Sequence, residues 1–332
     1  MAGAKGILLY SGGLDSLLAG RLLMEQGVEM SGVMFLLPFH APDCNPEDDR
    51  PAKIARDNGI PLRFFRCGRE YMEMVKNPPH GYGKRSNPCI DCKIYFLRKA
   101  GELMKSEGAS FVATGEVVGQ RPMSQMKHML RHIENESGLR DRLLRPLSAR
   151  LLPPTAVERE GLVDRDRLMG ISGRGRSIQL ELADAMGIAE YASPAGGCLF
   201  TDVQISRRVR DLFDLVPDFD MTDVYLLSVG RHLRAGDSLK FIVGRNEAEN
   251  AELEKYGPGA DVLLLPDFKG PVIYARGVVG EDDIRALASV AARYGRPAGE
   301  GDRIVLFRKG RPAGEVPSGI PVTDAVLRGM MI

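Results

Sequence analysis

Apolar segments of two different periods alternate along the N-terminal part of the chain. Short apolar runs typical of buried strands occupy residues 6–10, 28–37, 62–66 and 111–115. Apolar residues at helical spacing predict helices over residues 17–26, 51–58, 92–106, 163–169 and 178–186. This alternation is typical of a doubly wound α/β fold with a mostly parallel sheet. Such sheets bind ligands beyond the carboxyl ends of their strands.

A change in composition and in the pattern of apolar residues at residues 214–223 predicts a second domain. The stretch DLVPDFDMTD is rich in acidic residues and proline. Beyond it, short runs predict strands at 224–229, 239–243, 262–265, 272–275 and 304–307, and one helix over 282–294. We therefore expect an α/β domain over residues 1–213 and a smaller α+β domain over residues 214–332.

Composition narrows the class of protein. An apolar fraction of 44% supports a real core, and a net charge of +1 means that any nucleic-acid surface needs local clustering of charge. No apolar run approaches the roughly 20 residues of a membrane span, and residues 7–9 are too short for a signal-peptide core. We expect a cytoplasmic protein with no membrane partner. Five cysteines, an odd number, argue against a disulfide framework.

The polar turn YSGGLDS, residues 10–16, lies between the first strand run and an apolar helix. Glycines let an anion approach the backbone, and the N–H groups and dipole of the helix attract it. Ser11 and Ser16 add hydroxyl groups. Asp15 would repel phosphate unless Mg2+ lay between them, so it is a natural metal ligand.

Neither the Walker pattern G-x-x-x-x-G-K-[ST] nor the Rossmann pattern G-x-G-x-x-G occurs in this turn. SGGLDS instead resembles the S-G-G-x-D-S signature of the PP-loop ATP pyrophosphatases, which cleave ATP to AMP and pyrophosphate. The resemblance implies that pyrophosphate and Mg2+ are held by Ser11, Gly12, Gly13, Asp15 and Ser16.

Three cysteines form a second candidate site. Cys89 and Cys92 make a C-x-x-C pair in NPCIDCK, and Cys198 ends SPAGGC. Three thiolates are one fewer than zinc normally takes, but they can hold a 4Fe-4S cluster with one iron open for a sulfur species. Alternatively, one thiol carries a persulfide and another resolves it as a disulfide. We expect Cys67 to be an ordinary buried residue, and Cys44 has no evident partner.

The motifs SGGLDS, NPCIDCK, FVATGE and SPAGGC follow one another in the order seen in tRNA thiouridine synthetases. The C-x-x-C with a distant cysteine resembles the 2-thiouridylases, and LLRPLSARLLPPT, residues 143–155, resembles a segment of several tRNA thiolation enzymes. The resemblance covers roughly residues 5–205. It implies that ATP adenylates a uridine carbonyl oxygen and that a sulfur nucleophile then displaces AMP. The implied partners are tRNA and a sulfur donor, either sulfide or a persulfide carrier.

The same resemblance assigns further residues. Phe35 would border adenine, and Gly115 would allow close approach of the nucleotide. Independently of the resemblance, GEVVGQRPMSQMKH is dense in polar groups after a strand, and its best candidates for contacts to a phosphate or a base are Arg121 and Lys127. The alternative is a solvated helix start with Met123 and Met126 facing the core. Glu116 departs from the family pattern, because 2-thiouridylases usually have histidine and tyrosine after ATG. The modified uridine and the replaced oxygen therefore stay open. The implied catalytic residues are Asp15, Cys89, Cys92 and Cys198.

Basic residues cluster around these motifs and predict contacts to RNA phosphates. The clusters are Lys84, Arg85, Lys93, Arg98 and Lys99, then Arg174 and Arg176, then Arg207, Arg208 and Arg210. Residues 230–256 contain a G-R-N-x-x-x-N element that resembles the NFACT-type RNA-binding domain. By analogy the residues facing RNA would be Arg231, His232, Arg234, Lys240, Arg245 and Asn246.

The leading hypothesis is an ATP-dependent tRNA uridine sulfurtransferase with ATP, Mg2+ and a 4Fe-4S cluster as cofactors. One alternative is an enzyme that adenylates a different acceptor, a small-molecule carboxylate or carbonyl, for amidation or sulfur transfer. Another is a non-catalytic RNA-binding protein with a degenerate PP-loop.

Overall fold

The computed structural model describes residues 3–191, 197–236, 238–297, 299 and 301–332. The chain divides into two compact units, one formed by Met1–Leu37 and Asp43–Thr201 and the other by Pro38–Pro42 and Asp202–Ile332. Helix α8 (Val203–Leu215) falls in the second unit. A domain boundary after residue 213 would cut this helix near its end, and that boundary stays a prediction.

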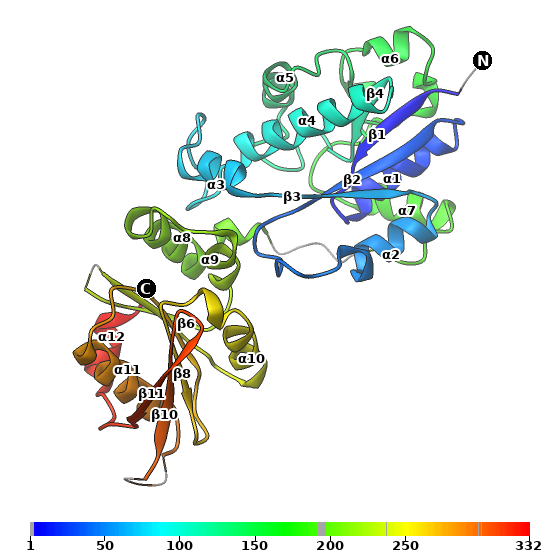
Figure 1. Cartoon of the computed structure of the whole chain (residues 1–332). Coiled ribbons are helices and arrows are strands. Elements are labelled where there is room, and N and C mark those ends of the chain that lie inside the picture. The colour runs from blue at the N-terminus through cyan, green and yellow to red at the C-terminus, as the bar shows by residue number, and fades with distance from the viewer. Residues whose placement is uncertain (1–2, 192–196, 237, 298, 300) are drawn as a thin grey trace. The chain divides into compact units, whose positions relative to one another are not determined.

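The first unit is built on a five-stranded sheet in the order β3-β2-β1-β4-β5 (Figure 1). All four strand pairs are parallel. The strands are β1 (Lys5–Leu9), β2 (Glu29–Leu36), β3 (Leu62–Arg66), β4 (Phe111–Thr114) and β5 (Leu143–Leu144). The chain builds outward from β1 to β3 and then returns to the other side of β1, so the strand order reverses between β1 and β4. Ligands of such sheets bind at this reversal.

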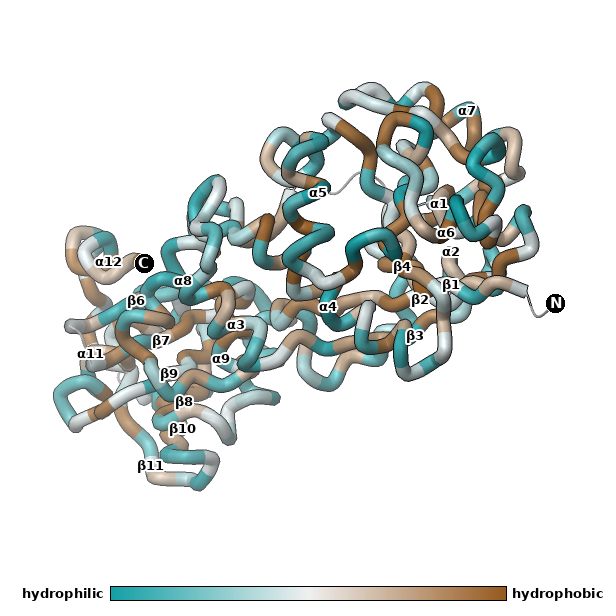
Figure 2. The backbone as a smooth tube through the Cα atoms, turned by 90° about the horizontal axis from the view of Figure 1, so that it is seen from above, coloured by the Kyte–Doolittle hydropathy of each residue, from teal (hydrophilic) through white to brown (hydrophobic). Residues whose placement is uncertain are grey.

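Alternate residues of the central strands face opposite layers of helices, as expected for a period of two. Leu8 packs in a core with α1 (Leu14–Met24), α2 (Arg50–Asp57) and α7 (Ser177–Ala185). Ile7 packs in a second core with α4 (Cys89–Ser106) and α5 (Lys127–Glu136). Figure 2 shows the hydrophobic character of the inner strand β4, which is buried along its whole length. The doubly wound α/β prediction is confirmed.

The second unit has a six-stranded antiparallel sheet in the order β11-β10-β8-β9-β7-β6. A core of its own joins the sheet to helix α11 (Glu281–Tyr294), so the α+β prediction is also confirmed. The strands are β6 (Arg231–Ala235), β7 (Leu239–Val243), β8 (Val262–Pro266), β9 (Ile273–Gly277), β10 (Arg303–Arg308) and β11 (Arg311–Pro317). The remaining helices are α9 (Met221–Leu226), α10 (Glu247–Lys255) and α12 (Asp324–Met330).

Two sequence-based element predictions are wrong. The expected strand at 224–229 begins inside helix α9, because Asp220 and Asp223 form a reciprocal capping box that starts a helix there. The expected helix at 163–169 is a single 3-10 turn, Arg165–Arg167.

The first unit also contains α3 (Arg69–Lys76) and α6 (Ala156–Arg159). Within the described ranges, every helix is too short or too polar to cross a bilayer.

Candidate active site

The turn after β1 is held in shape by its own serines. Gly12 has φ +78°, a conformation that glycine adopts at no steric cost, and Gly13 is the N-cap of α1. The Ser16 hydroxyl donates to the Gly13 carbonyl at 2.8 Å and accepts from the Ser11 backbone N–H at 3.3 Å. The Ser11 hydroxyl lies 3.2 Å from the same oxygen. The loop is therefore folded around Ser16, which is almost fully buried.

Asp15, in the first turn of α1, has one satisfied and one unsatisfied carboxylate oxygen. Gln120 donates to Oδ2 at 3.0 Å, and Arg176 lies 4.0 Å from that oxygen. Oδ1 is buried, and no described residue donates a hydrogen bond to it. A buried carboxylate oxygen without a donor is costly, and an oxygen-binding cation such as Mg2+ would satisfy it. The residues present therefore fit the Mg2+ that the sequence predicts.

Gly115, directly after β4, packs against the start of α1. A Cβ atom at this position would overlap the backbone of Asp15 and Ser16. The glycine thus allows the β4 turn to touch the PP-loop. Its predicted contact with nucleotide stays a prediction.

The next residue, Glu116, lies in a buried ionic cluster. It pairs with Lys93, the residue after the C-x-x-C, and with Arg145 at 3.1 Å. Arg145 also pairs with Glu134 at 2.9 Å and donates to the Leu130 carbonyl. Burial on its own would raise the pKa of Glu116, but Lys93 and Arg145 outweigh it and lower the pKa to about 2. Glu116 is therefore ionised at neutral pH and links the PP-loop side of the sheet to the cysteine helix.

Cys89 and Cys92 occupy the first turn of α4. The Cys89 thiol lies 3.5 Å from the Ser124 hydroxyl, and Cys92 is buried with its sulfur 3.0 Å from the Tyr71 hydroxyl. Burial raises the pKa of Cys92 well above its usual range; the Tyr71 hydrogen bond opposes this, and the charges of the neighbouring thiols add to it. Burial also raises the pKa of Cys198, with a further contribution from Cys89. The three predicted cysteines thus lie near enough to interact electrostatically.

These thiols are the soft donors that an iron–sulfur cluster needs, but in the described part of the chain they are not arranged as a preformed metal site. Among the described residues, no three His, Cys, Asp or Glu side chains are arranged to hold a metal ion. The raised pKa values of Cys92 and Cys198 keep both thiols protonated, so binding a cluster would release protons. Residues 192–196, which include the first four residues of the SPAGGC motif, lie outside the described residues.

Sequence reasoning missed that Cys67 is a neighbour of this site. Its thiolate would interact with Cys92, and burial raises its own pKa to about 12. Cys67 directly follows β3, and carboxyl ends of parallel strands gather at one edge. That position was the available signal. Cys67 is buried as predicted.

A second missed feature is a chain of polar side chains that begins inside the C-x-x-C. The buried Asp91 carboxylate accepts from the His80 backbone N–H at 3.1 Å and lies 2.7 Å from His80 Nδ1. His80 Nε2 lies 2.8 Å from Nε2 of His132 on α5. These contacts fasten the loop before α4 to the helix that carries the cysteines.

Three other residues were predicted to contact the nucleotide, namely Phe35, Arg121 and Lys127. Phe35 on β2 stacks on Phe96 with a centroid distance of 4.5 Å and lies 5.2 Å from Phe65. Arg121 is exposed, and its charge lowers the pKa of Cys198 against the larger effect of burial. Lys127 is exposed at the first position of α5.

Several basic residues predicted to contact RNA are engaged within the protein. Lys93 pairs with buried Glu116, and the buried Arg208 donates to the carbonyls of Leu227 and Gly230. The prediction is wrong for these two residues, because their charges are used internally. Arg98 and Lys99 remain at the surface with acidic partners on neighbouring helices.

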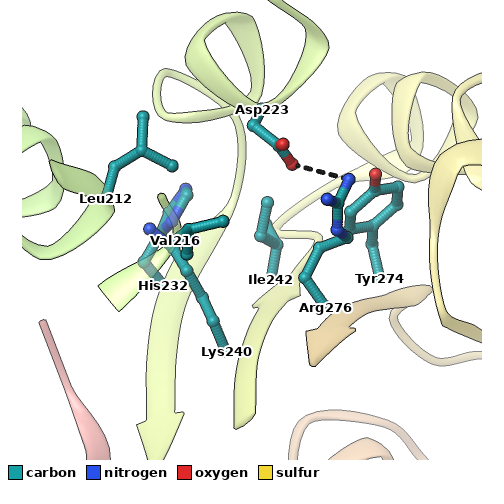
Figure 3. A pocket seen from close by; sticks show the side chains of 8 residues that line it. All are labelled: Leu212, Val216, Asp223, His232, Lys240, Ile242, Tyr274 and Arg276. Atoms are coloured by element: carbon teal, nitrogen blue, oxygen red, sulfur yellow. Dashed lines mark ion pairs between the residues drawn. The ribbon is translucent and has the colours of Figure 1, made fainter. Parts of the chain in front are cut away.

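The same holds for His232, Arg234 and Lys240 of the second unit, of which Figure 3 shows His232 and Lys240. His232 and Lys240 are buried beside a cavity of about 10 Å3, which has room for at most one water. Lys240 pairs with Asp211 at 2.8 Å, and Arg234 binds the same carboxylate through two nitrogens. Burial lowers the pKa of His232 well below its usual range, with help from the charges of Lys240 and Arg208. These side chains are engaged inside the unit, which contradicts their predicted place on an RNA-binding surface.

Two known families match separate parts of the chain. Residues 2–150 match the family described as "Thiamine biosynthesis protein (ThiI)", and residues 230–324 match the "NFACT protein RNA binding domain". A probable tRNA sulfurtransferase of Methanosarcina mazei is 34% identical over 125 residues, which cover 35% of this chain and 29% of that protein. The tRNA-specific 2-thiouridylase MnmA of Acidithiobacillus ferrooxidans is 26% identical over 307 residues, 88% of this chain and 79% of that protein.

The match spans only about a third of the MnmA relative from Leptospira interrogans, 34% of its length. Among solved structures, a 4-thiouridine synthetase–RNA complex with bound ATP is 22% identical with a TM-score of 0.34, covering 55% of this chain and 50% of that one. The U34-tRNA thiolase NcsA from Methanococcus maripaludis is 15% identical with a TM-score of 0.32, covering 68% and 69%. The resemblance expected from the motifs is confirmed: residues 2–150 are related to the PP-loop tRNA thiouridine synthetases, and residues 230–324 to the NFACT RNA-binding domain.

Proposed function

We propose that the chain is an ATP-dependent tRNA uridine sulfurtransferase. One observation carries the proposal: a continuous line of contacts joins the candidate ATP loop to the cysteines. Asp15 and Ser16 touch Gly115, Glu116 binds Lys93, and Lys93 follows Cys92 on α4. Adenylation acts on a carbonyl oxygen and sulfur attacks the carbon that bears this oxygen, so the residues for both steps must lie around one site.

In the first step, ATP lies with its β- and γ-phosphates at the turn formed by residues 11–16. Asp15 would hold Mg2+ against these phosphates, and the N-terminus of α1 would stabilise their charge. The uridine carbonyl oxygen attacks the α-phosphorus, an O–P bond forms, and the bond to the β-phosphate oxygen breaks. Pyrophosphate leaves, and the base carries an AMP group on its former carbonyl oxygen.

In the second step, a sulfur nucleophile attacks the activated carbon and AMP leaves with the oxygen. The sulfur comes from sulfide or from a persulfide carrier. Cys89, Cys92 and Cys198 would hold a 4Fe-4S cluster, whose open iron supplies a place for sulfide when the cluster is bound. In the persulfide route, one of these thiols would carry the outer sulfur that attacks the carbon, and a second thiol would then release the thiolated base by forming a disulfide with the first. An added thiol reductant would reduce this disulfide before the next turnover.

The test is a reaction of the whole protein with tRNA, ATP, Mg2+ and sulfide under exclusion of oxygen. We expect AMP, pyrophosphate and thiouridine in equal amounts, measured by nucleotide chromatography and mass spectrometry of digested tRNA. AMP formed without tRNA, or with a small carboxylate in its place, would move the acceptor away from RNA. Binding of tRNA with no AMP at all would leave an RNA-binding protein.

Iron and acid-labile sulfide are measured on the same anaerobic preparation. About four irons per chain, lost on replacing any of the three cysteines by alanine, would support the cluster. Thiolation without iron, dependent on a persulfide donor, would move the mechanism to a relay between cysteines.

A further inference from the structure

A second pocket lies beside the edge strand β5 of the first unit. It has a volume of about 610 Å3 and is enclosed by α5, β5 and residues 149–159, which include the start of α6. Its described lining contains none of residues 11–16 and not Gly115. The pocket is therefore separate from the PP-loop, although a volume of this size accepts a nucleotide.

The unpaired charges of this pocket are positive. Lys127, Arg131 and Arg140 line it and are exposed, and the described residues offer none of them an ion pair. Its carboxylates are all engaged by arginines: Glu134 with Arg145, Asp141 with Arg159, and Glu158 with Arg165. The pocket thus presents three free cations and offers no free carboxylate among its described residues.

Apolar surface completes the pocket. Pro153 and Pro154 are exposed, and Leu152 is half-buried beside them. Lys127 and His128 stand in the first turn of the ten-residue helix α5, whose N-terminus adds partial positive charge. Phosphate contacts together with a flat apolar surface suit a nucleotide turned out of a single-stranded loop. An acidic peptide would use the cations but has no base or ribose to place against the prolines.

We propose that this pocket binds the RNA substrate, with Arg131, Arg140 and Lys127 on backbone phosphates and the prolines against a base or ribose. The inference rests on the proposed function and deepens it by naming a docking site for tRNA on the catalytic unit itself. In this proposal the RNA contacts first predicted for Lys93 and Arg208, which are paired inside the protein, are made by Lys127, Arg131 and Arg140 instead.

The test compares two double variants of the full chain with equal loss of charge. The first double variant, Arg131→Ala with Arg140→Ala, removes two of the three unpaired positive charges of the pocket. Arg63→Ala with Arg69→Ala removes two arginines, paired with Glu107 and Glu73, on and beside β3 at the opposite edge of the sheet. Affinity for tRNA is measured by fluorescence anisotropy over a range of salt concentrations, and ATP binding is measured in parallel.

We expect the pocket variant to bind tRNA at least about tenfold more weakly, with the slope of log affinity against log salt reduced by about one to two. The control variant should bind within about twofold of the unchanged protein, and both should bind ATP normally. Equal losses in the two variants, or no loss in the pocket variant, would overturn the inference. Displacement of tRNA by an acidic peptide from the unchanged protein alone would assign the pocket to a protein ligand.

The two proposals fail separately. If the unchanged protein forms thiouridine and the pocket variant binds tRNA as well as it does, the docking site is wrong and the function stands. If the pocket variant loses tRNA affinity but no preparation forms thiouridine or AMP, the docking site stands and the function is wrong. A thermal melt of each variant checks that it is folded.

Discussion

The Asp15 carboxylate is satisfied on one oxygen and bare on the other, in a loop that otherwise bonds to itself. We expect Asp15→Asn to reduce pyrophosphate release at least about 100-fold, because the amide keeps the shape but loses the charge that binds Mg2+. The assay is pyrophosphate release over a series of Mg2+ concentrations. Activity that is unchanged at every Mg2+ concentration would remove Asp15 from the metal site.

Gly115 touches the backbone of the PP-loop, so its size matters more than its flexibility. We expect Gly115→Ala to weaken ATP binding at least about tenfold and to lower the melting temperature, because the new methyl group displaces the start of α1. Gly175→Ala is the control, since open space surrounds that glycine. Isothermal titration with ATP compares the two variants, and equal affinities would show that the loop tolerates the methyl group.

At the level of elements, Glu116 joins β4, β5 and α4 through Lys93 and Arg145. Its pKa of about 2 lies below the ordinary value of 4.5, so folding favours the ionised form. The resulting stabilisation, up to about 3 kcal/mol, is complete above pH 4.5 and is lost as the pH falls towards 2. We therefore expect the free energy of unfolding of the unchanged protein to fall over this range.

The matched variant is Glu116→Gln, which cannot titrate. Its free energy of unfolding from urea titrations should be lower at pH 7, by about 3 kcal/mol, and less dependent on pH between 5 and 3. A variant as stable as the unchanged protein at pH 7, with the same pH profile, would show that the cluster contributes nothing to folding.

Sequence patterns predicted the elements whose signals are local. The turn at residues 11–16 could be predicted because glycines, serines and an aspartate follow an apolar run directly, and it lies between β1 and α1 as expected. The partners of charged residues were not predictable, since Lys93 and Glu116 are 23 positions apart and Glu116 and Arg145 are 29 apart. The same limit made Lys93 and Arg208 look free. Part of helix α9 was mistaken for a strand because a short, mostly apolar run fits both structures.

At the scale of the whole molecule, helix α8 decides where the second unit begins. Arg208 on this helix donates to the carbonyls of Leu227 and Gly230, and Phe213 packs 5.8 Å from Phe219. We expect the fragment 202–332 to unfold cooperatively and to be several kcal/mol more stable than 214–332, which lacks these contacts. Urea titrations followed by circular dichroism make the comparison. Equal stability would support the boundary after residue 213 instead.

The line of contacts from Asp15 through Gly115 and Glu116 to Lys93 also has a thermodynamic consequence. If nucleotide binding at residues 11–16 moves the residues that make these contacts, it changes the affinity of the cysteines on α4 for their own ligand. Because binding free energies are linked, whatever binds the cysteines must then change nucleotide affinity by the same factor. The loop and the cysteines would thereby report their occupancy to each other through their binding affinities.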